Sequence, residues 1–176
     1  RVWEHEPAEA LAALAAGAVD LALVYDYSLA PLRFEPTLDV VRLWSAGWSL
    51  GVPAELADAR ALLSDDPSAA AVLREFREHR WIVNSRNTAD EEVVRVLAAM
   101  GEFEPHIAHR ADSLDLVADL IATGNGVGLL PSDGARGPGV RLLPLRRPAA
   151  LLRAFAVTRR GHTRWSPLAA VRSLLT

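Results

Sequence analysis

Cysteine is absent from this 176-residue sequence, and aromatic residues make up only 6% of it. The absence of cysteine excludes disulfide bonds, cysteine nucleophiles and zinc sites built from cysteine. No apolar run reaches the roughly 18 residues that a membrane-spanning helix needs, so we expect no membrane partner. The net charge of −3 leaves no basic surface for nucleic acid. No signal peptide and no initiator Met are visible at Arg1, so we expect a cytoplasmic piece of a longer protein.

Hydrophobic residues make up 51% of the sequence, enough for a core without disulfides or metals. Residues 81–131 alternate apolar runs with polar turns, in the order strand, helix, strand, helix, strand. The short loops between these elements indicate parallel strands with right-handed crossovers. The predicted strands are residues 81–83, 107–108 and 127–130. The first predicted helix is opened by a capping box of Thr88 with Glu91 and ended by a left-handed Gly101. The second is capped by Asp112 and Ser113 and ended by Gly124.

The rest of the chain continues the α/β pattern. Apolar runs without alternation predict strands that are covered on both faces, and Pro or Ser–Pro marks helix starts. The predicted elements are a strand at 2–3, a helix from Pro7 to Gly17, strands at 18–24, 38–43 and 48–52, a helix at 70–78, strands at 140–145 and 154–158, and a final helix after Ser166 and Pro167.

Two parts of the sequence resemble the regulatory domain of LysR-type transcriptional regulators. The first is Ala10-Leu11-Ala12-Ala13-Leu14 followed by Gly17-Ala18-Val19-Asp20-Leu21-Ala22-Leu23. The second is residues 101–105, Asp112 and the run 120–131, LIATGNGVGLLP. The closing strand with Arg159-Arg160-Gly161 and the helix after Ser166-Pro167 also fit, so the resemblance covers nearly the whole chain.

This resemblance implies an α/β fold of two Rossmann-like lobes, periplasmic-binding-protein-like (type 2), with two interlobe crossings. Laid on this sequence, lobe I is residues 1–53 plus 157–176 and lobe II is residues 54–156. The first strand and helix of lobe I are missing, because Val2 and Trp3 fit the second strand. The helix-turn-helix through which such regulators bind DNA is also absent. The implied partners are a small-molecule effector, other copies in a homo-oligomer of the full-length protein, and RNA polymerase.

The best candidate site is Asn84-Ser85-Arg86-Asn87-Thr88, which follows a strand and opens a helix. Free backbone N–H groups and the helix dipole favour an anion there, and Arg86 could pair bidentately with a carboxylate. Helix capping by Thr88 alone, with a solvated Arg86, is the alternative. The resemblance implies that effectors, often carboxylates or aromatics, bind in this cleft.

Other candidates lie at further strand ends and helix starts. Tyr25 and Asp26, before Tyr27, exit a strand, and tyrosine can stack on a ligand and donate a hydrogen bond, although an ordinary loop explains them equally well. Glu6, between His5 and Pro7, should approach the same cleft, or only opens a helix. Asp112 begins a helix, and capping is its alternative role.

Several motifs are excluded as functional sites. The run 124–128 closes a helix and opens a strand, so it is no phosphate loop, and its glycines should allow a tight turn and close packing. His106 and His109 point to opposite faces of a strand, which makes a poor metal pair. No motif of a hydrolase or metalloprotease is present. We therefore expect no metal, no cofactor and no catalytic residues.

The sequence thus predicts the ligand-sensing domain of a LysR-type regulator, in which a small-molecule effector, such as a carboxylate, shifts a pre-existing equilibrium of conformations. A solute-binding protein of the same bilobal fold is the alternative and would carry an export signal upstream. An enzyme on this scaffold is a further alternative, which would need a convergent set of acid, base or nucleophile that the sequence does not show.

Overall fold

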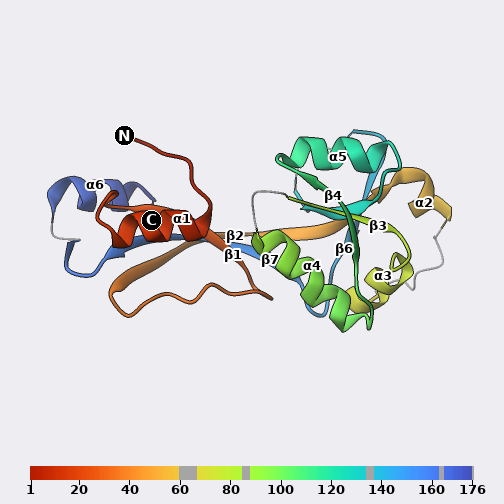
Figure 1. Cartoon of the computed structure of the whole chain (residues 1–176), viewed down its shortest axis with the longest axis horizontal. Coiled ribbons are helices and arrows are strands. Elements are labelled where there is room, and N and C mark those ends of the chain that lie inside the picture. The colour runs from red at the N-terminus through yellow and green to blue at the C-terminus, as the bar shows by residue number, and fades with distance from the viewer. Residues whose placement is uncertain (60–66, 85–87, 134–136, 163–164, 176) are drawn as a thin grey trace. The chain divides into compact units, whose positions relative to one another are not determined.

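The computed structural model describes residues 1–59, 67–84, 88–133, 137–162 and 165–175 (Figure 1). The chain forms two compact units. Unit 1 consists of Arg1–Ser45 and Leu152–Thr176, and unit 2 of Ala46–Leu151. The chain therefore crosses between the units twice, and both crossings lie within strands, β2 (Leu38–Pro53) and β7 (Ala150–Arg159). The family resemblance places the lobe boundaries after Pro53 and before Val157, and these boundaries remain a prediction.

Unit 2 is built on parallel strands joined by helices, as its sequence predicts. Strand β3 pairs in parallel with both β4 and β5, and β5 pairs antiparallel with the second half of β2. Residues 48–53 of β2 are all buried, because β5 and β6 pair with this part of the strand. The bounds are β3 (Arg80–Asn84), β4 (His106–Ala111), β5 (Val127–Pro131) and β6 (Val140–Pro144), with α2 (Ala54–Ala59), α3 (Ala69–Glu75), α4 (Thr88–Met100) and α5 (Leu114–Ala122).

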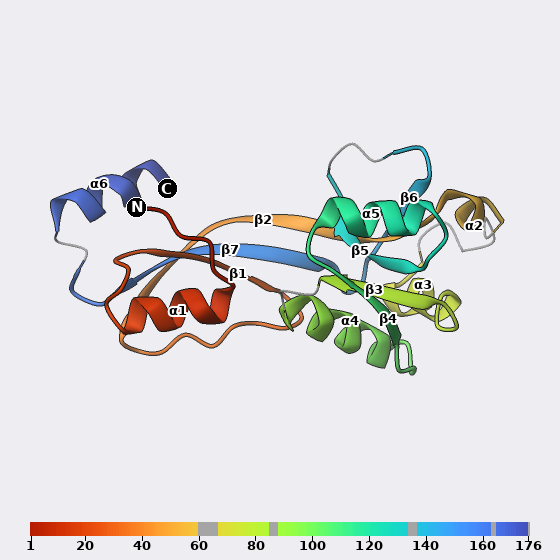
Figure 2. The same cartoon turned by 45° about the horizontal axis from the view of Figure 1, so that its top comes forward.

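Helices cover both faces of these strands. Figures 1 and 2 show α5 on one face and α4 on the other. The α5 face is closed by a cluster of Ile82, Ala111, Val117, Ile121 and Leu130. On the opposite face α4 packs against β3 and α3 and buries Val93, Val94, Leu97 and Ala98.

Some local predictions for unit 2 are wrong. Residues 38–53 form one 16-residue strand instead of two, because the second half pairs with β5 and β6 without a break in the strand. The left-handed residue after α4 is Glu102, with φ 62°, and not Gly101. Gly101 is needed for space, since a Cβ there would lie 2.9 Å from the Phe103 ring. Met100, near the end of α4, is 43% exposed, and helix α2 was not predicted.

Unit 1 contains an antiparallel pair, β1 (Ala22–Tyr27) with β7, and the first half of β2, which follows β7 in the sheet. Helix α1 (Pro7–Ala15), which the sequence predicts, packs on β1 in a cluster of Leu14, Ala22, Val24 and Val157. Gly17, with φ 76°, ends this helix. Helix α6 (Ser166–Leu175) is amphipathic and buries Leu168.

Two predictions for unit 1 are wrong. Residues 1–6 form no strand, and Val2 is 97% exposed, because none of the described residues pairs with this segment. A lone extended segment cannot form a ladder. Strand β1 starts at Ala22 instead of Ala18 and includes Tyr25, Asp26 and Tyr27, which the sequence places after the strand. The reason is that this polar end has partners on β7 directly opposite.

Candidate functional site

The carboxyl ends of β3, β4 and β5 meet at one edge of the unit 2 sheet, and polar residues gather there. The register places Asn84 of β3 opposite Ala111 of β4, so Asp112 and Ser113 come directly after the neighbouring strand end. Ser132 follows β5 on the other side of β3. In open α/β sheets, ligands bind at the carboxyl ends of the strands. This carboxyl edge is therefore the candidate site.

Two serines at the carboxyl edge are held together. The Oγ atoms of Ser49 and Ser132 are 2.8 Å apart, and the Ser132 N–H donates to the carbonyl of Gly47 at 2.8 Å. Ser49 is buried with 3% of its surface exposed, whereas Ser132 is exposed. Strand β2 thus fixes Ser132 at the rim, where its hydroxyl can donate to or accept from a ligand.

Beneath the carboxyl edge lies a cavity of about 10 Å³. This volume is close to the minimum for one water molecule, so the cavity itself does not hold an organic ligand. Its polar lining comes from Asn84 and Asp90, and Asp90 is 8% exposed in the first turn of α4. The apolar lining consists of Trp48, Ile82, Val83, Val94, Leu114, Val117 and Leu129. A ligand would bind above this floor.

Helices α4 and α5 both begin at the carboxyl edge. Ser113 is the N-cap of α5, and its Oγ accepts the N–H of Leu116 at 3.2 Å. The capping role expected there belongs to Ser113, while Asp112 is exposed. Both helix N-termini carry partial positive charge, so together they favour an anion.

An ion-pair network fixes the start of α4 to β4. Glu91 Oε1 accepts from Arg95 Nη2 at 2.8 Å, and Glu91 Oε2 accepts from Arg110 Nη2 at 2.7 Å. These two hydrogen bonds lower the pKa of Glu91 below its ordinary value. Glu91 therefore stays ionised and anchors the helix whose N-terminus belongs to the candidate site.

The other predicted contacts of this site cannot be placed. Ser85, Arg86 and Asn87 lie outside the described residues, as does the side chain of Thr88 and with it the expected capping box. Effector contact by Asn84, Ser85, Arg86, Thr88 and Asp112 remains a prediction.

In unit 1, Asp26 has a role that the sequence did not suggest. It is 1% exposed, and both of its carboxylate oxygens bind Arg153, at 2.7 Å each. Asp26 Oδ2 also accepts the N–H of Leu32 at 2.9 Å. The hydrogen bonds to Asp26 raise the pKa of Arg153 above its ordinary value. Asp26 is thus held inside the fold, and effector contact by it stays a prediction.

The remaining predicted residues of unit 1 are Tyr25 and Glu6. Tyr25 is half-buried on β1, and the neighbouring Tyr27 is fully buried. Glu6 is the N-cap of α1 and shares a capping box with Glu9, whose Oε2 accepts the Glu6 N–H at 3.2 Å. Since β1 ends where α1 begins, both residues lie at one end of unit 1. Their contact with an effector is likewise untested.

Sequence reasoning missed Trp48, Ser49, Ser132 and Arg153. Ser132 could have been found, because it follows the third predicted strand at the same sheet edge as Asn84 and Asp112. Arg153 carried no local signal, since its partner Asp26 lies 127 residues earlier. The prediction for the glycine run 124–128 is confirmed: Gly124 has φ 76°, and a Cβ at Gly128 would lie 2.8 Å from the Ile82 carbonyl oxygen.

The described residues contain no group of three or more His, Asp or Glu side chains that could hold a metal ion. None of the helices in the described part of the chain is long and apolar enough to cross a membrane.

Two α/β units, crossed twice by the chain and carrying polar strand ends, define the class of periplasmic-binding-protein-like (type 2) ligand-binding domains. Within it, the family model described as "LysR substrate binding domain" matches residues 1–176. The chain belongs to this family, so both the fold and the family predicted from the sequence are confirmed. No curated protein matches the chain significantly.

Solved structures agree on the fold. The C-terminal domain of a probable LysR family transcriptional regulator from Rhodococcus sp. RHA1 has 21% identity and a TM-score of 0.75, over 98% of this chain and 81% of that one. HinK, a LysR family transcriptional regulator from Pseudomonas aeruginosa, has 18% identity and a TM-score of 0.74, over 99% and 58%. The effector binding domain of a BenM variant has 16% identity and a TM-score of 0.69, over 90% and 71%.

The chain spans only part of the regulators that it resembles: 58% of HinK and 52% of OxyR from Corynebacterium glutamicum. The family is one of transcriptional regulators, and the chain corresponds to their effector-binding domain.

Proposed function

We propose that this domain binds a small carboxylate effector at the carboxyl edge of β3, β4 and β5 and passes the binding event to a DNA-binding domain elsewhere in the same protein. One observation carries this proposal: Asn84, Ser132 and the N-terminus of α5 come from three separate elements and converge on one sheet edge.

The chemistry of the carboxyl edge suits an anion of small size. The N-termini of α4 and α5 offer backbone N–H groups, Ser132 offers a hydroxyl held by Ser49, and Asn84 offers an amide. Arg86 follows β3 by two residues and would supply the charge for a bidentate pair with a carboxylate. The apolar floor formed by Trp48, Val83 and Leu129 would take the rest of the ligand.

In the full-length protein we propose that effector binding shifts an equilibrium between conformations of a homo-oligomer. DNA would be bound only through a helix-turn-helix domain outside residues 1–176, in the cytoplasm, with RNA polymerase as a further partner. No catalytic role is proposed, because the described polar groups of the carboxyl edge can hydrogen-bond a ligand but include no paired nucleophile and base.

The test is a thermal-shift screen of the domain against a panel of small carboxylates and their uncharged amides. A ligand that binds only the folded state stabilises it by about 2.7 kcal/mol at a hundredfold excess over its Kd. Any carboxylate that shifts the wild type is then tested on Ser132→Ala and Arg86→Ala. The matched control is Arg33→Ala, since Arg33 is an exposed arginine in unit 1.

We expect a carboxylate, but not its amide, to raise the Tm of the wild type and of the Arg33→Ala variant. Both edge variants should lose most of this shift. A ligand whose shift survives both edge substitutions would place the effector elsewhere and contradict the proposed site.

A further inference from the structure

Ser49 carries a buried hydroxyl inside the sheet of unit 2. Its residue surface is only 3% exposed, and β2 is paired on both sides at this position, with Leu130 of β5 and Pro144 of β6. Neighbouring strands therefore occupy the main chain on both sides of Ser49. A hydroxyl has one proton to donate, and burying that proton without an acceptor costs free energy comparable to a lost hydrogen bond.

The partner of this hydroxyl is Ser132. The two Oγ atoms are 2.8 Å apart, and the described residues offer the Ser49 side chain no second hydrogen-bond partner. If Ser132 donated the bond, the proton of Ser49 would be buried without an acceptor. If Ser49 donates, its proton is satisfied, and the proton of the exposed Ser132 remains available to water or a ligand. The second arrangement is therefore favoured.

Strand β2 holds Ser132 at a second point. The Ser132 N–H donates to the carbonyl of Gly47 at 2.8 Å, and a Cβ at Gly47 would lie 3.3 Å from Ser132 Oγ. The hydroxyl of Ser132 thus lies close over the bare backbone of Gly47. Since the main chain and the Oγ atom are both held by β2, the main freedom left is rotation about the Cβ–Oγ bond. The hydrogen bond from Ser49 restricts this rotation.

The serine pair lies on the face of the sheet that α5 covers. Gly51 of β2 faces α5, because a Cβ there would lie 3.1 Å from Ile121 Cδ1. Side chains two residues apart on a strand point to the same face, so Ser49 shares this face with Gly51. The Ser132 hydroxyl, bonded to Ser49, is therefore on the side of the carboxyl edge where α5 begins.

We propose that Ser49 is a positioning residue of the effector site, whose hydroxyl donates to Ser132 Oγ and so directs the Ser132 proton toward the ligand. This inference rests on the proposed function, since it concerns the same carboxyl edge. The edge then presents the O–H of Ser132 beside the N–H groups at the start of α5. It favours a ligand group that accepts hydrogen bonds, such as a carboxylate, over one that only donates, such as an ammonium.

NMR spectroscopy of residues 1–176 without any ligand tests the direction of the bond. In an equal mixture of light and heavy water, a serine hydroxyl that exchanges slowly gives two Cβ signals, one for the protonated and one for the deuterated group. We expect two signals for Ser49 and one for Ser132, whose proton faces water. Ser45, an exposed serine of the same strand, is the control and should give one. A single signal for Ser49, or two for Ser132, would overturn the proposal.

Acetate is the probe for the effect on binding, measured by NMR titration of the amide signals around Ser132. We expect Ser49→Ala to weaken acetate binding about fivefold, because the Ser132 proton loses the bond that orients it. Ser49→Thr keeps the hydroxyl and should restore most of the affinity. Ser45→Ala, the same truncation on the same strand, should bind acetate like the wild type.

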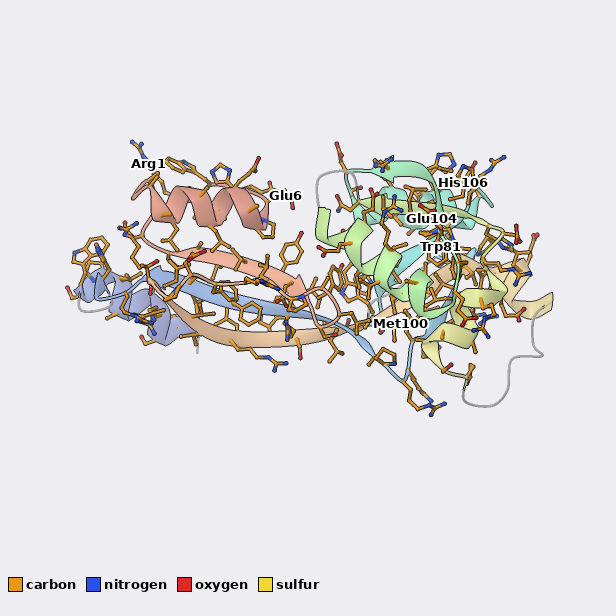
Figure 3. All side chains as sticks on the ribbon, turned by 60° about the horizontal axis from the view of Figure 1, so that its bottom comes forward. Arg1, Glu6, Trp81, Met100, Glu104 and His106 are labelled. Atoms are coloured by element: carbon orange, nitrogen blue, oxygen red, sulfur yellow. The ribbon has the colours of Figure 1, made fainter. Side chains whose placement is uncertain are left out.

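The indole N–H signal of Trp81 is an internal control in this titration. Figure 3 labels Trp81 and His106, which belong to the amino ends of β3 and β4, and the carboxyl edge is the opposite end of these strands. Acetate bound at the carboxyl edge should therefore leave the Trp81 signal unchanged. Loss of this signal in Ser49→Ala would identify a damaged fold, in which case Ser49→Thr against the wild type decides.

Ser132→Ala separates positioning from a general effect on the fold. If Ser49 acts through Ser132, Ser49→Ala should change acetate affinity by less than about 1.5-fold in the Ser132→Ala background. An equal loss in both backgrounds would overturn the proposal. Failure of the wild type to bind acetate would count against the carboxylate site of the proposed function, whereas the hydroxyl exchange of Ser49 and Ser132 would still decide which serine donates.

Discussion

Asp26 and Arg153 lie directly opposite each other on β1 and β7 and form a bidentate ion pair, with Nε–Oδ1 and Nη2–Oδ2 distances of 2.7 Å. The Asp26 side chain is 1% exposed and that of Arg153 26%. The Arg153 guanidinium also lies 5.7 Å from the centre of the Phe155 ring. The pair therefore binds two strands that are distant in sequence.

We expect Asp26→Asn to lower the free energy of unfolding by about 2 kcal/mol, because it leaves the partly buried Arg153 without its counter-charge. Urea denaturation measures this loss. The double variant Asp26→Leu with Arg153→Met should lose less free energy of unfolding than the sum of the losses of Asp26→Leu and Arg153→Met measured singly. Arg160→Met is the control: Arg160 Nε is 3.6 Å from Asp39 Oδ1, its side chain is 65% exposed, and its loss should change stability by less than about 0.5 kcal/mol. Additive losses would contradict the coupling.

The Glu91 network predicts a pH dependence of stability. Because hydrogen bonds from Arg95 and Arg110 lower the pKa of Glu91 in the folded state, its contribution is present above the ordinary glutamate pKa of 4.5 and is lost as the pH falls through the lowered pKa. Glu91→Gln should therefore cost about 1 kcal/mol at pH 7, and this cost should shrink as the pH falls below 4.5. Urea denaturation over this pH range is the measurement.

The matched control for Glu91 is Glu92→Gln, since Glu92 is the exposed neighbour on the same helix. Its effect on stability should be small at every pH. An equal pH dependence of both variants would mean that the effect comes from the overall charge of α4 instead of the ion pairs.

Gly128 should tolerate no side chain. A Cβ at this position would lie 2.8 Å from the carbonyl oxygen of Ile82 on the neighbouring strand, so Gly128→Ala must push β5 and β3 apart. We expect a loss of about 2 kcal/mol in thermal or urea unfolding. Gly137→Ala is the control, because nothing lies within 4 Å of its Cβ position and stability should hardly change.

Ser113 and Asp112 can be separated by stability alone. Ser113→Ala removes the cap of α5 and should cost about 1 kcal/mol, whereas Asp112→Ala leaves the hydrogen bond from the Leu116 N–H to Ser113 Oγ in place and should cost less. Thermal melts of the two variants make the comparison. A larger loss for Asp112→Ala would assign the start of α5 to the aspartate.

Much of the fold could be predicted because its signals are local. The parallel unit of β3, α4, β4, α5 and β5 follows from apolar runs, the capping Ser113 and the left-handed Gly124. Errors arose where partners are distant. Strand β1 takes in Tyr25 to Tyr27 because of β7, and β2 runs unbroken because β5 and β6 pair with its second half.

Only those residues of the candidate site that lie at the ends of recognisable strands could be predicted from the sequence. Asn84 and Asp112 were found because each ends a recognisable strand, and Ser132 could have been found by the same rule. Ser49 could not be found in this way, since its role depends on a hydrogen bond to Ser132, which lies 83 positions away in the sequence. Asp26 looked like a ligand contact because nothing nearby in the sequence reveals Arg153.

The two segments of unit 1 are made at different times during synthesis on the ribosome, because unit 2 lies between them in the sequence. Residues 46–151 of unit 2 are continuous, whereas Arg1–Ser45 needs Leu152–Thr176 to complete its sheet. At translation rates of about 5 to 20 residues per second, β7 is synthesised roughly 5 to 20 s after Arg1–Ser45. The turn after α1 is completed only when Arg159 arrives, whose Nη1 donates to the carbonyls of Leu14 and Val19 at 2.6 and 2.8 Å. During this interval the apolar face of α1 has no finished sheet to cover it, so newly made chains depend on chaperones most before Leu152–Thr176 emerges.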